Sequence, residues 1–216
     1  MVKCAFFFGL FIVFVVGVQF SFTHDYGELQ VQSPLNETKK KSVYANYKRS
    51  NTVQYHWETS FKELLVNRHP LPKGFSLTKV DVGSFEDWLR CLPLKPKGTP
   101  IKLFNGKKKM VQALNAGVLD IDVGKTDLQQ CADAVMRLKA EYLYSKKKFA
   151  NIHFNYTSGF KAEYAKWREG YKIGVKGNSV YYYKKPLSTD KTYQGFRKYL
   201  WNVYNYAGTY SLNKEL

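Results

Sequence analysis

The residue best suited to chemistry in this sequence is Cys131, which follows Gln130 near the start of a predicted helix. A thiolate at a helix N-terminus is stabilised by the positive end of the helix dipole and by amides that lack helical partners. The amides near Gln130 and Cys131 could also donate to an oxyanion. The pattern predicts the nucleophile of a cysteine hydrolase that acts on a peptide or a related amide. The competing interpretation is a small core residue, because Cys131 shares a helical stripe with Leu128 and Val135.

A thiol nucleophile needs a general base, usually a histidine, and a third group that orients the base. His153 is the histidine nearest to Cys131 in the sequence. Alternation over residues 152–156 places it on the same strand face as Asn155, so it could act as a base with an orienting amide. The competing interpretation is an exposed strand histidine.

Three predicted elements position these residues. Alternating apolar and acidic residues predict a strand over residues 118–123, and residues 152–157 predict another. Between them, Thr126 and Gln129 match a capping box, which predicts that the helix begins just after Thr126. Cys131 would then lie in the second helical turn, somewhat deep for the dipole effect.

Two further groups of charged residues lie on these elements. Asp120 and Asp122 share one face of the predicted strand and could serve a metal ion or acid–base chemistry, although a half-exposed edge strand is the competing interpretation. Arg137 and Glu141 are four residues apart on the helix, and we expect a structural ion pair.

The flanking elements complete an α+β fold, with a small and mostly antiparallel sheet packed on helices. Ser84 predicts the N-cap of a helix. Asn105-Gly106 predicts a hairpin turn within residues 101–111. Residues 171–190 read as a loop, with a short strand at residues 181–183 as an alternative. Residues 193–206 predict a helix. Its inward face carries Phe196, Leu200, Val203 and Tyr204.

The chain is strongly basic, with 34 Lys and Arg against 17 Asp and Glu, a net charge of +17. Lysine clusters at residues 39–41, 107–109 and 146–148 are typical of solvated faces, but they also suit an acidic neighbour such as anionic lipid or an envelope polymer. Nucleic-acid-binding signatures are lacking, so we do not expect a nucleic-acid partner. No CxxC or HExxH motif occurs, and neither a metal nor a cofactor is predicted.

The N-terminus carries one lysine ahead of a long apolar run, which is the layout of a signal peptide. We assign residues 1–21 to a signal peptide or an uncleaved membrane anchor, residues 22–52 to a polar linker, and residues 53–216 to a single α+β domain. The expected location is therefore outside the cytoplasm, in the periplasm or associated with the envelope. The oligomeric state is left open.

Aromatic residues offer a second class of function. They could line a groove for sugar or peptide, although aromatics at helical spacing usually belong to a core. A basic and tyrosine-rich surface would suit a non-catalytic envelope protein that binds an acidic polymer or a protein partner. The aromatics concerned are Trp88, Trp167, Tyr171, Tyr181, Tyr182 and Tyr183.

Three long motifs carry a resemblance to a known family. They are GSFEDWLRCLPLKPKGTPIKLFNGKKK, AGVLDIDVGKTDLQQCADAVMRLKAEYLYSKKKFANIHFNYTSGF and YQGFRKYLWNVYNYAGTYSLNKEL. Over roughly residues 75–216 the chain resembles the bacterial family described as domain of unknown function 4846. The resemblance implies an exported protein whose activity is not settled.

The resemblance also has implications for the site. Members of that family continue into a β-rich region with a Gly-His-Ala-Val strand, an order similar to papain-like cell-wall peptidases of the NlpC type. It implies that Cys131 is the nucleophile, that the histidine base belongs to that region, and that this chain is a C-terminally truncated, inactive member with an incomplete papain-like fold. Cys91 stands where the family has another residue, which argues against a role for it.

Overall fold

The computed structural model describes residues 47–60, 63–69 and 71–215, and it confirms the α+β class. Its strands form antiparallel pairs, β1 with β2, β3 with β4 and β5 with β6, so the described part has three two-stranded ladders where one small sheet was expected. A papain-like arrangement stays a prediction. The strands are β1 (Glu63–Leu64), β2 (Pro93–Leu94), β3 (His153–Asn155), β4 (Lys161–Glu163), β5 (Tyr171–Lys176) and β6 (Ser179–Lys184).

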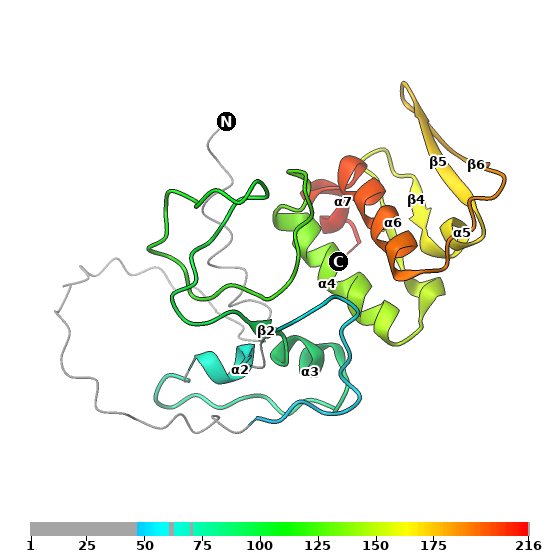
Figure 1. Cartoon of the computed structure of the whole chain (residues 1–216). Helices are drawn as coiled ribbons and strands as arrows, with labels where there is room; N and C mark the ends of the chain where they lie inside the picture. Colours follow the sequence, from blue (N-terminus) through cyan, green and yellow to red (C-terminus); the bar gives the residue numbers. More distant parts are fainter. Residues whose placement is uncertain (1–46, 61–62, 70, 216) are drawn as a thin grey trace.

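Helices dominate the arrangement seen in Figure 1, where α4 crosses the centre of the molecule. The helix α4 contacts α3 and α7, and its side chains bond to α6. None of the described helices is long and apolar enough to cross a membrane. The helices are α2 (Leu65–Arg68), α3 (Phe85–Arg90), α4 (Cys131–Ser145), the 3-10 turn η1 (Phe149–Asn151), α5 (Tyr164–Arg168), α6 (Tyr193–Tyr206) and α7 (Thr209–Asn213).

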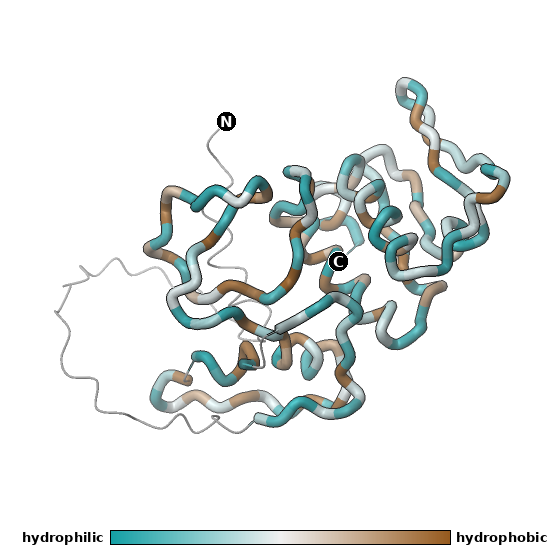
Figure 2. The backbone as a smooth tube through the Cα atoms, in the orientation of Figure 1, coloured by the Kyte–Doolittle hydropathy of each residue, from teal (hydrophilic) through white to brown (hydrophobic). Residues whose placement is uncertain are grey.

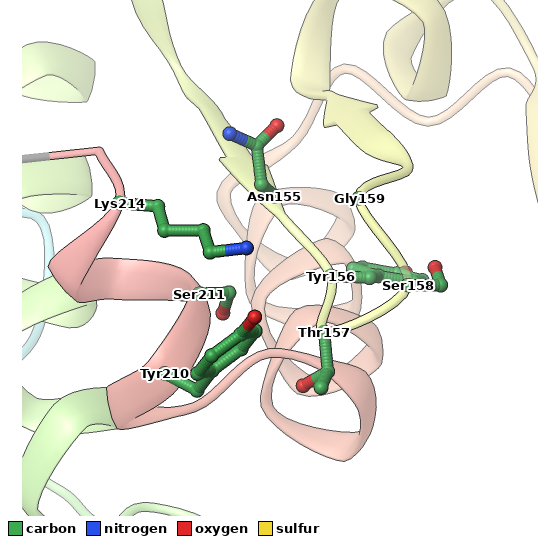
Figure 3. A pocket seen from close by; sticks show the side chains of 8 residues that line it. All are labelled: Asn155, Tyr156, Thr157, Ser158, Gly159, Tyr210, Ser211 and Lys214. Atoms are coloured by element: carbon green, nitrogen blue, oxygen red, sulfur yellow. The ribbon is translucent and has the colours of Figure 1, made fainter.

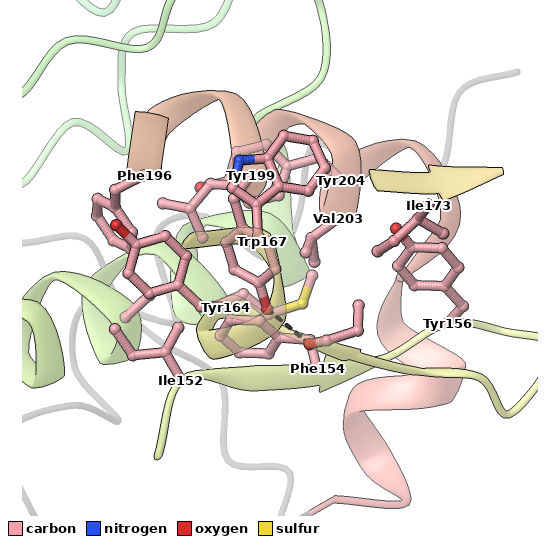
Figure 4. Packing of buried hydrophobic residues seen from close by; sticks show 14 of the residues in the cluster. Ile152, Phe154, Tyr156, Tyr164, Trp167, Ile173, Phe196, Tyr199, Val203 and Tyr204 are labelled. Carbon is pink, nitrogen blue, oxygen red and sulfur yellow. Dashed lines mark hydrogen bonds between the residues drawn. The ribbon is translucent and has the colours of Figure 1, made fainter. Parts of the chain in front are cut away.

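Two hydrophobic clusters lie on either side of α4. The C-terminal cluster, drawn in part in Figure 4, joins α4 to β3, α5, α6 and α7 through fully buried residues such as Phe154, Phe196 and Leu200. The N-terminal cluster joins residues 53–57 and 64–66 to α3 and β2 around Trp88. Tyr193 packs against both clusters, so α6 reaches across the boundary between them.

This double packing explains a difference from the sequence pattern on α4. The stripe predicted around Cys131 runs on through Leu138 and Tyr142, and it is split, because Val135 packs against the C-terminal cluster while Leu138 and Tyr142 pack against the N-terminal one. The most buried residues of the helix lie on its opposite face and include charged ones: Asp133, Met136, Arg137, Ala140, Glu141 and Tyr144. The helical period was predicted correctly, but the buried face was not.

The helix predicted over residues 193–206 is confirmed as α6. Thr192 caps it, because the Thr192 side chain accepts a hydrogen bond from the Gly195 amide at 3.1 Å. Phe196, Leu200 and Val203 are fully buried, as the pattern predicted. The Ser84 cap is likewise confirmed, since its hydroxyl accepts from the Asp87 amide at the start of α3.

A long segment between β2 and α4 has little regular structure. The predicted hairpin is confirmed only as a tight turn, with a single bridge between Lys102 and Lys108 and with Gly106 at a φ of +82°. The strand predicted over residues 118–123 is wrong, apart from a bridge between Leu119 and Leu94. Figure 2 shows hydrophobic residues along this segment, which forms a wide loop extending away from the helices.

The predicted signal peptide or anchor, residues 1–21, lies outside the described residues, as does most of the predicted linker, residues 22–52.

The loop predicted over residues 171–190 is wrong in its first part. β5 and β6 pair in register from Tyr171 opposite Lys184 to Lys176 opposite Ser179, and they form the hairpin that projects beside α6 in Figure 1.

Candidate functional site

The N-terminus of α4 holds two of the predicted site residues. Gln130 is the N-cap and Cys131 is the first helical residue. The Gln130 amide donates to Asp133 Oδ2 at 3.0 Å, so the carboxylate three residues on supplies the cap. The cysteine is half-buried in the first turn, nearer to the positive end of the helix than the sequence suggested.

The cap predicted at Thr126 is therefore wrong. Residues 125–128 form a bend and a turn ahead of the helix, with the Leu128 amide donating to the Thr126 carbonyl at 2.9 Å. The cause is a tertiary contact: Gln129 Oε1 accepts from Arg137 Nη1 at 2.8 Å instead of reaching back to the Thr126 amide. The buried Arg137 therefore binds the Gln129 side chain, which the predicted capping box would use.

His153 lies on β3 opposite Glu163 and is half-buried. Burial lowers the pKa of its imidazole, and Lys161 and Lys139 lower it further. The structure places Gln130 and Cys131 together at the start of α4 and His153 on a separate element, β3.

The other described histidines belong to other parts of the chain. His56 packs edge-on against Tyr144 near the end of α4, with ring centroids 4.8 Å apart, and stacks on Tyr193. His69 follows α2, and burial lowers the pKa of its imidazole. The combination of Cys131 with a histidine base stays a prediction.

Cys91 differs sharply from Cys131. It is fully buried at the C-terminal end of α3. Burial, aided by the neighbouring Asp87, raises the pKa of its thiol to about 12. Both residues are thiols in the structure, without a disulfide between them. Cys91 is thus an inert core residue.

An ionic network, buried at Arg137 and Glu141 and exposed at Asp122, lies between the two hydrophobic clusters. Arg137 is fully buried, and its Nε donates to Glu141 Oε1 at 2.7 Å, which confirms the expected ion pair. The Tyr193 hydroxyl donates to the same oxygen at 2.6 Å. Arg197 of α6 holds Asp122 through two hydrogen bonds of 2.8 and 2.9 Å, and Arg137 Nη2 reaches Asp122 at 3.2 Å. We call these five residues the seam network.

The two predicted strand carboxylates point to different partners. Asp120 Oδ2 accepts from the Thr59 hydroxyl and the Ser60 amide, each at 2.8 Å, whereas Asp122 joins the seam network. The two arginines lower the pKa of the Asp122 carboxyl against the opposing effect of burial. Within the described residues, no three His, Cys, Asp or Glu side chains could hold a metal ion.

The larger of the described cavities lies on the other side of α6, with a volume of about 590 Å³. Three lysines line it, and Lys172 Nζ lies 3.9 Å from the centroid of the Trp167 ring. Lys198 pairs with Asp190 at 3.2 Å. We call it the lysine cavity; its lining is Trp167, Lys172, Ile173, Tyr183, Lys185, Pro186, Leu187, Ser188, Thr189, Asp190, Lys198 and Asn202.

Burial and the neighbouring lysines act together on Lys172. Burial is the main cause that lowers the pKa of the Lys172 ammonium, and Lys198 and Lys185 lower it further, against the opposing charge of Asp190. Trp167 and Tyr183 of this lining were among the aromatics expected of a groove, but its lysines were not predicted, because residues 171–190 read as a loop. The signal was present, since Tyr171, Ile173 and Val175 alternate with polar residues ahead of Gly177-Asn178.

A smaller cavity of about 170 Å³ lies between the β3–β4 turn and α7. Figure 3 shows Tyr210 of α7 and Lys214, which follows that helix, on one side of it and the end of β3 on the other. The Asn155 amide in its wall donates to Glu215. Its size suits a few water molecules, so the lysine cavity is the better candidate for a polymer.

Comparisons with known proteins agree with the motifs. No curated protein and no solved structure matches the chain. A family model matches residues 65–216, which is more than half of the chain. The chain therefore belongs to the family described as domain of unknown function 4846.

Proposed function

We propose that this protein binds an acidic polymer of the cell envelope through the lysine cavity. The observation that carries the proposal is the charge of the lining, where three lysines face one carboxylate, Asp190. Asp190 is paired with Lys198, so the cavity keeps an excess of positive charge. Carboxylate or phosphate groups spaced along a polymer would supply the missing negative charges.

Aromatic groups beside the lysines support the same ligand class. Tyr181 and Tyr183 are exposed on one face of β6, and Tyr183 lines the cavity. Their rings offer apolar faces next to the charges, which suits a polymer of acidic sugars. Trp88, by contrast, is fully buried in the N-terminal cluster and contributes to the core. The envelope setting follows from the prediction for residues 1–21.

The test measures binding of polygalacturonate, with neutral dextran as the reference polymer. The variant Lys172→Gln/Lys185→Gln removes two charges from the cavity. We expect its affinity to fall by about tenfold, because two exposed ionic contacts contribute about 1.4 kcal/mol together. Added salt should weaken binding of the unmodified chain, since exposed charges are screened.

The matched control is Lys147→Gln/Lys148→Gln, which removes the same charge from the exposed end of α4. It should change the affinity by less than about twofold, because these lysines lie outside the cavity lining. Equal losses in the two variants would show that only net charge matters, and the proposal for the cavity would fail. Binding to dextran as tight as to polygalacturonate would also contradict it.

A cysteine hydrolase of cell-wall peptide or a related amide is the second candidate. The observation that favours it is Cys131 at the first position of a 15-residue helix. There the thiolate would attack a carbonyl carbon and nearby amides would donate to the oxyanion. Its general base is not identified, because His153 lies on a separate element, β3, so the cavity remains the first proposal.

Alkylation by iodoacetamide tests the second candidate. At neutral pH only a few per cent of an ordinary thiol is ionised, so an activated Cys131 should react about tenfold faster than free cysteine. Cys91 should stay unmodified, because it is fully buried and the pKa of its thiol is about 12. A Cys131→Ala chain labelled as fast as the unmodified chain, or a Cys131 no faster than free cysteine, would refute this candidate.

A further inference from the structure

The segment between β2 and α4 exposes an unusual number of large apolar side chains. Met110 is 97% exposed, and four others are between 40% and 63% exposed. They come from one short stretch, residues 101–114, which we call the apolar loop. Isolated surface hydrophobics need no explanation, but several in one loop indicate an interaction site. The exposed side chains are Leu103, Phe104, Met110, Val111 and Leu114.

All the charged residues of the same segment are basic. Six lysines and no Asp or Glu occur in residues 91–119, and four of these lysines lie within the apolar loop. Asp87 and Asp120, the nearest carboxylates on each side, are already bonded to Gly83 and Ser60. This surface presents both apolar groups and an excess of positive charge. It complements a partner whose outer surface is anionic and whose interior is apolar.

Hydrogen bonds hold the loop in shape without burying its apolar groups. The Leu103 amide donates to the Lys107 carbonyl at 2.8 Å, which closes the turn. At the base, the Gln112 side chain accepts from the Ile101 amide at 2.8 Å and donates to the carbonyls of Ile101 and Lys109. A preformed loop loses less conformational entropy on binding than a flexible one.

We propose that the apolar loop docks onto the surface of an anionic lipid bilayer. Met110, Val111 and Leu114 enter the boundary between headgroups and acyl chains, while the flanking lysines contact the lipid phosphates. Each contribution alone is weak, and the combination gives stable attachment. This surface is separate from the lysine cavity, because none of residues 101–114 lines that cavity. An acidic polymer would use the lysines alone and leave the apolar groups in water.

The test follows hydrogen–deuterium exchange of the full chain with vesicles. Residues 5–20 form an apolar run that could itself bind lipid, so the readout must be local to the loop. With vesicles of phosphatidylcholine and phosphatidylglycerol, exchange at residues 101–114 should slow by about threefold or more. With phosphatidylcholine alone it should slow much less, and exchange at β5 and β6 should not change.

The variant Met110→Asp/Leu114→Asp should abolish the slowing, because it places charge in the lipid boundary. Both residues are exposed, so the fold is retained. The matched control is Phe75→Asp/Val82→Asp, which changes charge and exposed apolar groups equally in another segment, and it should keep the slowing.

Three results would overturn the proposal. The first is unchanged exchange at residues 101–114 in the presence of anionic vesicles. The second is equal slowing in the Met110→Asp/Leu114→Asp variant. The third is equal slowing with polygalacturonate in place of vesicles, which would assign the loop to an acidic polymer.

Discussion

Two charged regions flank α6, and they differ in how their charges are balanced. On one side the seam network sets Arg137 and Arg197 against Glu141 and Asp122. On the other side the lysine cavity sets Lys172, Lys185 and Lys198 against Asp190 alone. The first region is largely buried between the two hydrophobic clusters, and the second is open to solvent.

The difference separates a structural role from a binding role. Charges buried in a protein must be paired, because an unpaired one loses its hydration without compensation. The seam network meets that condition and ties residues 122, 137 and 197 together across the molecule. Exposed lysines carry no such requirement and remain available for an external anion. Changes in the seam should therefore alter stability, and changes in the cavity should alter binding.

The largest effect is expected from Glu141→Ala in the seam. It leaves Arg137, which is fully buried, without its closest carboxylate. The free energy of unfolding should fall by about 3 kcal/mol or more, measured by urea denaturation. The control Glu163→Ala breaks the exposed pair with Lys166 and should cost less than about 1 kcal/mol. Similar losses in both variants would mean that burial does not distinguish the two pairs.

A pH-dependent effect of intermediate size is expected from the buried carboxylate Asp133, which forms no ion pair with the part of the chain that the structure describes. Burial raises the pKa of this carboxyl to about 6, and within the described residues its Oδ1 has no hydrogen-bond partner. Because the folded pKa lies above the unfolded one, the protonated form stabilises the fold. Its contribution is complete below about pH 4 and is lost as the pH rises through about 6.

The variant Asp133→Asn tests this effect, because the amide oxygen can still accept from the Gln130 amide. The difference in unfolding free energy between the unmodified chain and the variant should change by up to about 2 kcal/mol between about pH 4 and pH 6. Asp127→Asn, at an exposed aspartate nearby, is the control. A flat difference for Asp133→Asn would show that this carboxyl is not desolvated.

The smallest effect on stability is expected in the cavity. Lys172→Gln/Lys185→Gln should lower the free energy of unfolding by less than about 1 kcal/mol, mainly through the lost contact of Lys172 with the Trp167 ring. The same variant should lose most of its affinity for polygalacturonate. If it unfolds as easily as Glu141→Ala, the cavity lysines are part of the structure, and the distinction between the two regions fails.

Local signals in the sequence were enough to predict α6 and the start of α3. Both helices begin at a Thr or Ser whose cap contact involves only neighbouring residues. The start of α4 was misplaced because Arg137, eight residues away, draws the Gln129 side chain. The strand predicted over residues 118–123 failed for a similar reason, since Asp120 and Asp122 bond to distant groups. Contacts of this kind are not encoded in hydrophobic periodicity.

The candidate sites also differ in how far local sequence signals could predict them. Cys131 was expected near a helix start because the signals for that helix are local, although the helix begins later than predicted. The lysines of the cavity could not be predicted to lie together, since Lys172, Lys185 and Lys198 come from β5, the loop after β6 and α6. The three lysines come together because the β5–β6 hairpin lies beside α6.

The most direct test of the central claim is a map of hydrogen–deuterium exchange with bound polygalacturonate. If the lysine cavity binds the polymer, exchange should slow most at β5 and at residues 185–190, with little change in α4 or the apolar loop. Slowing spread over all lysine clusters, or none at residues 171–190 while the polymer is bound, would contradict the assignment of the cavity.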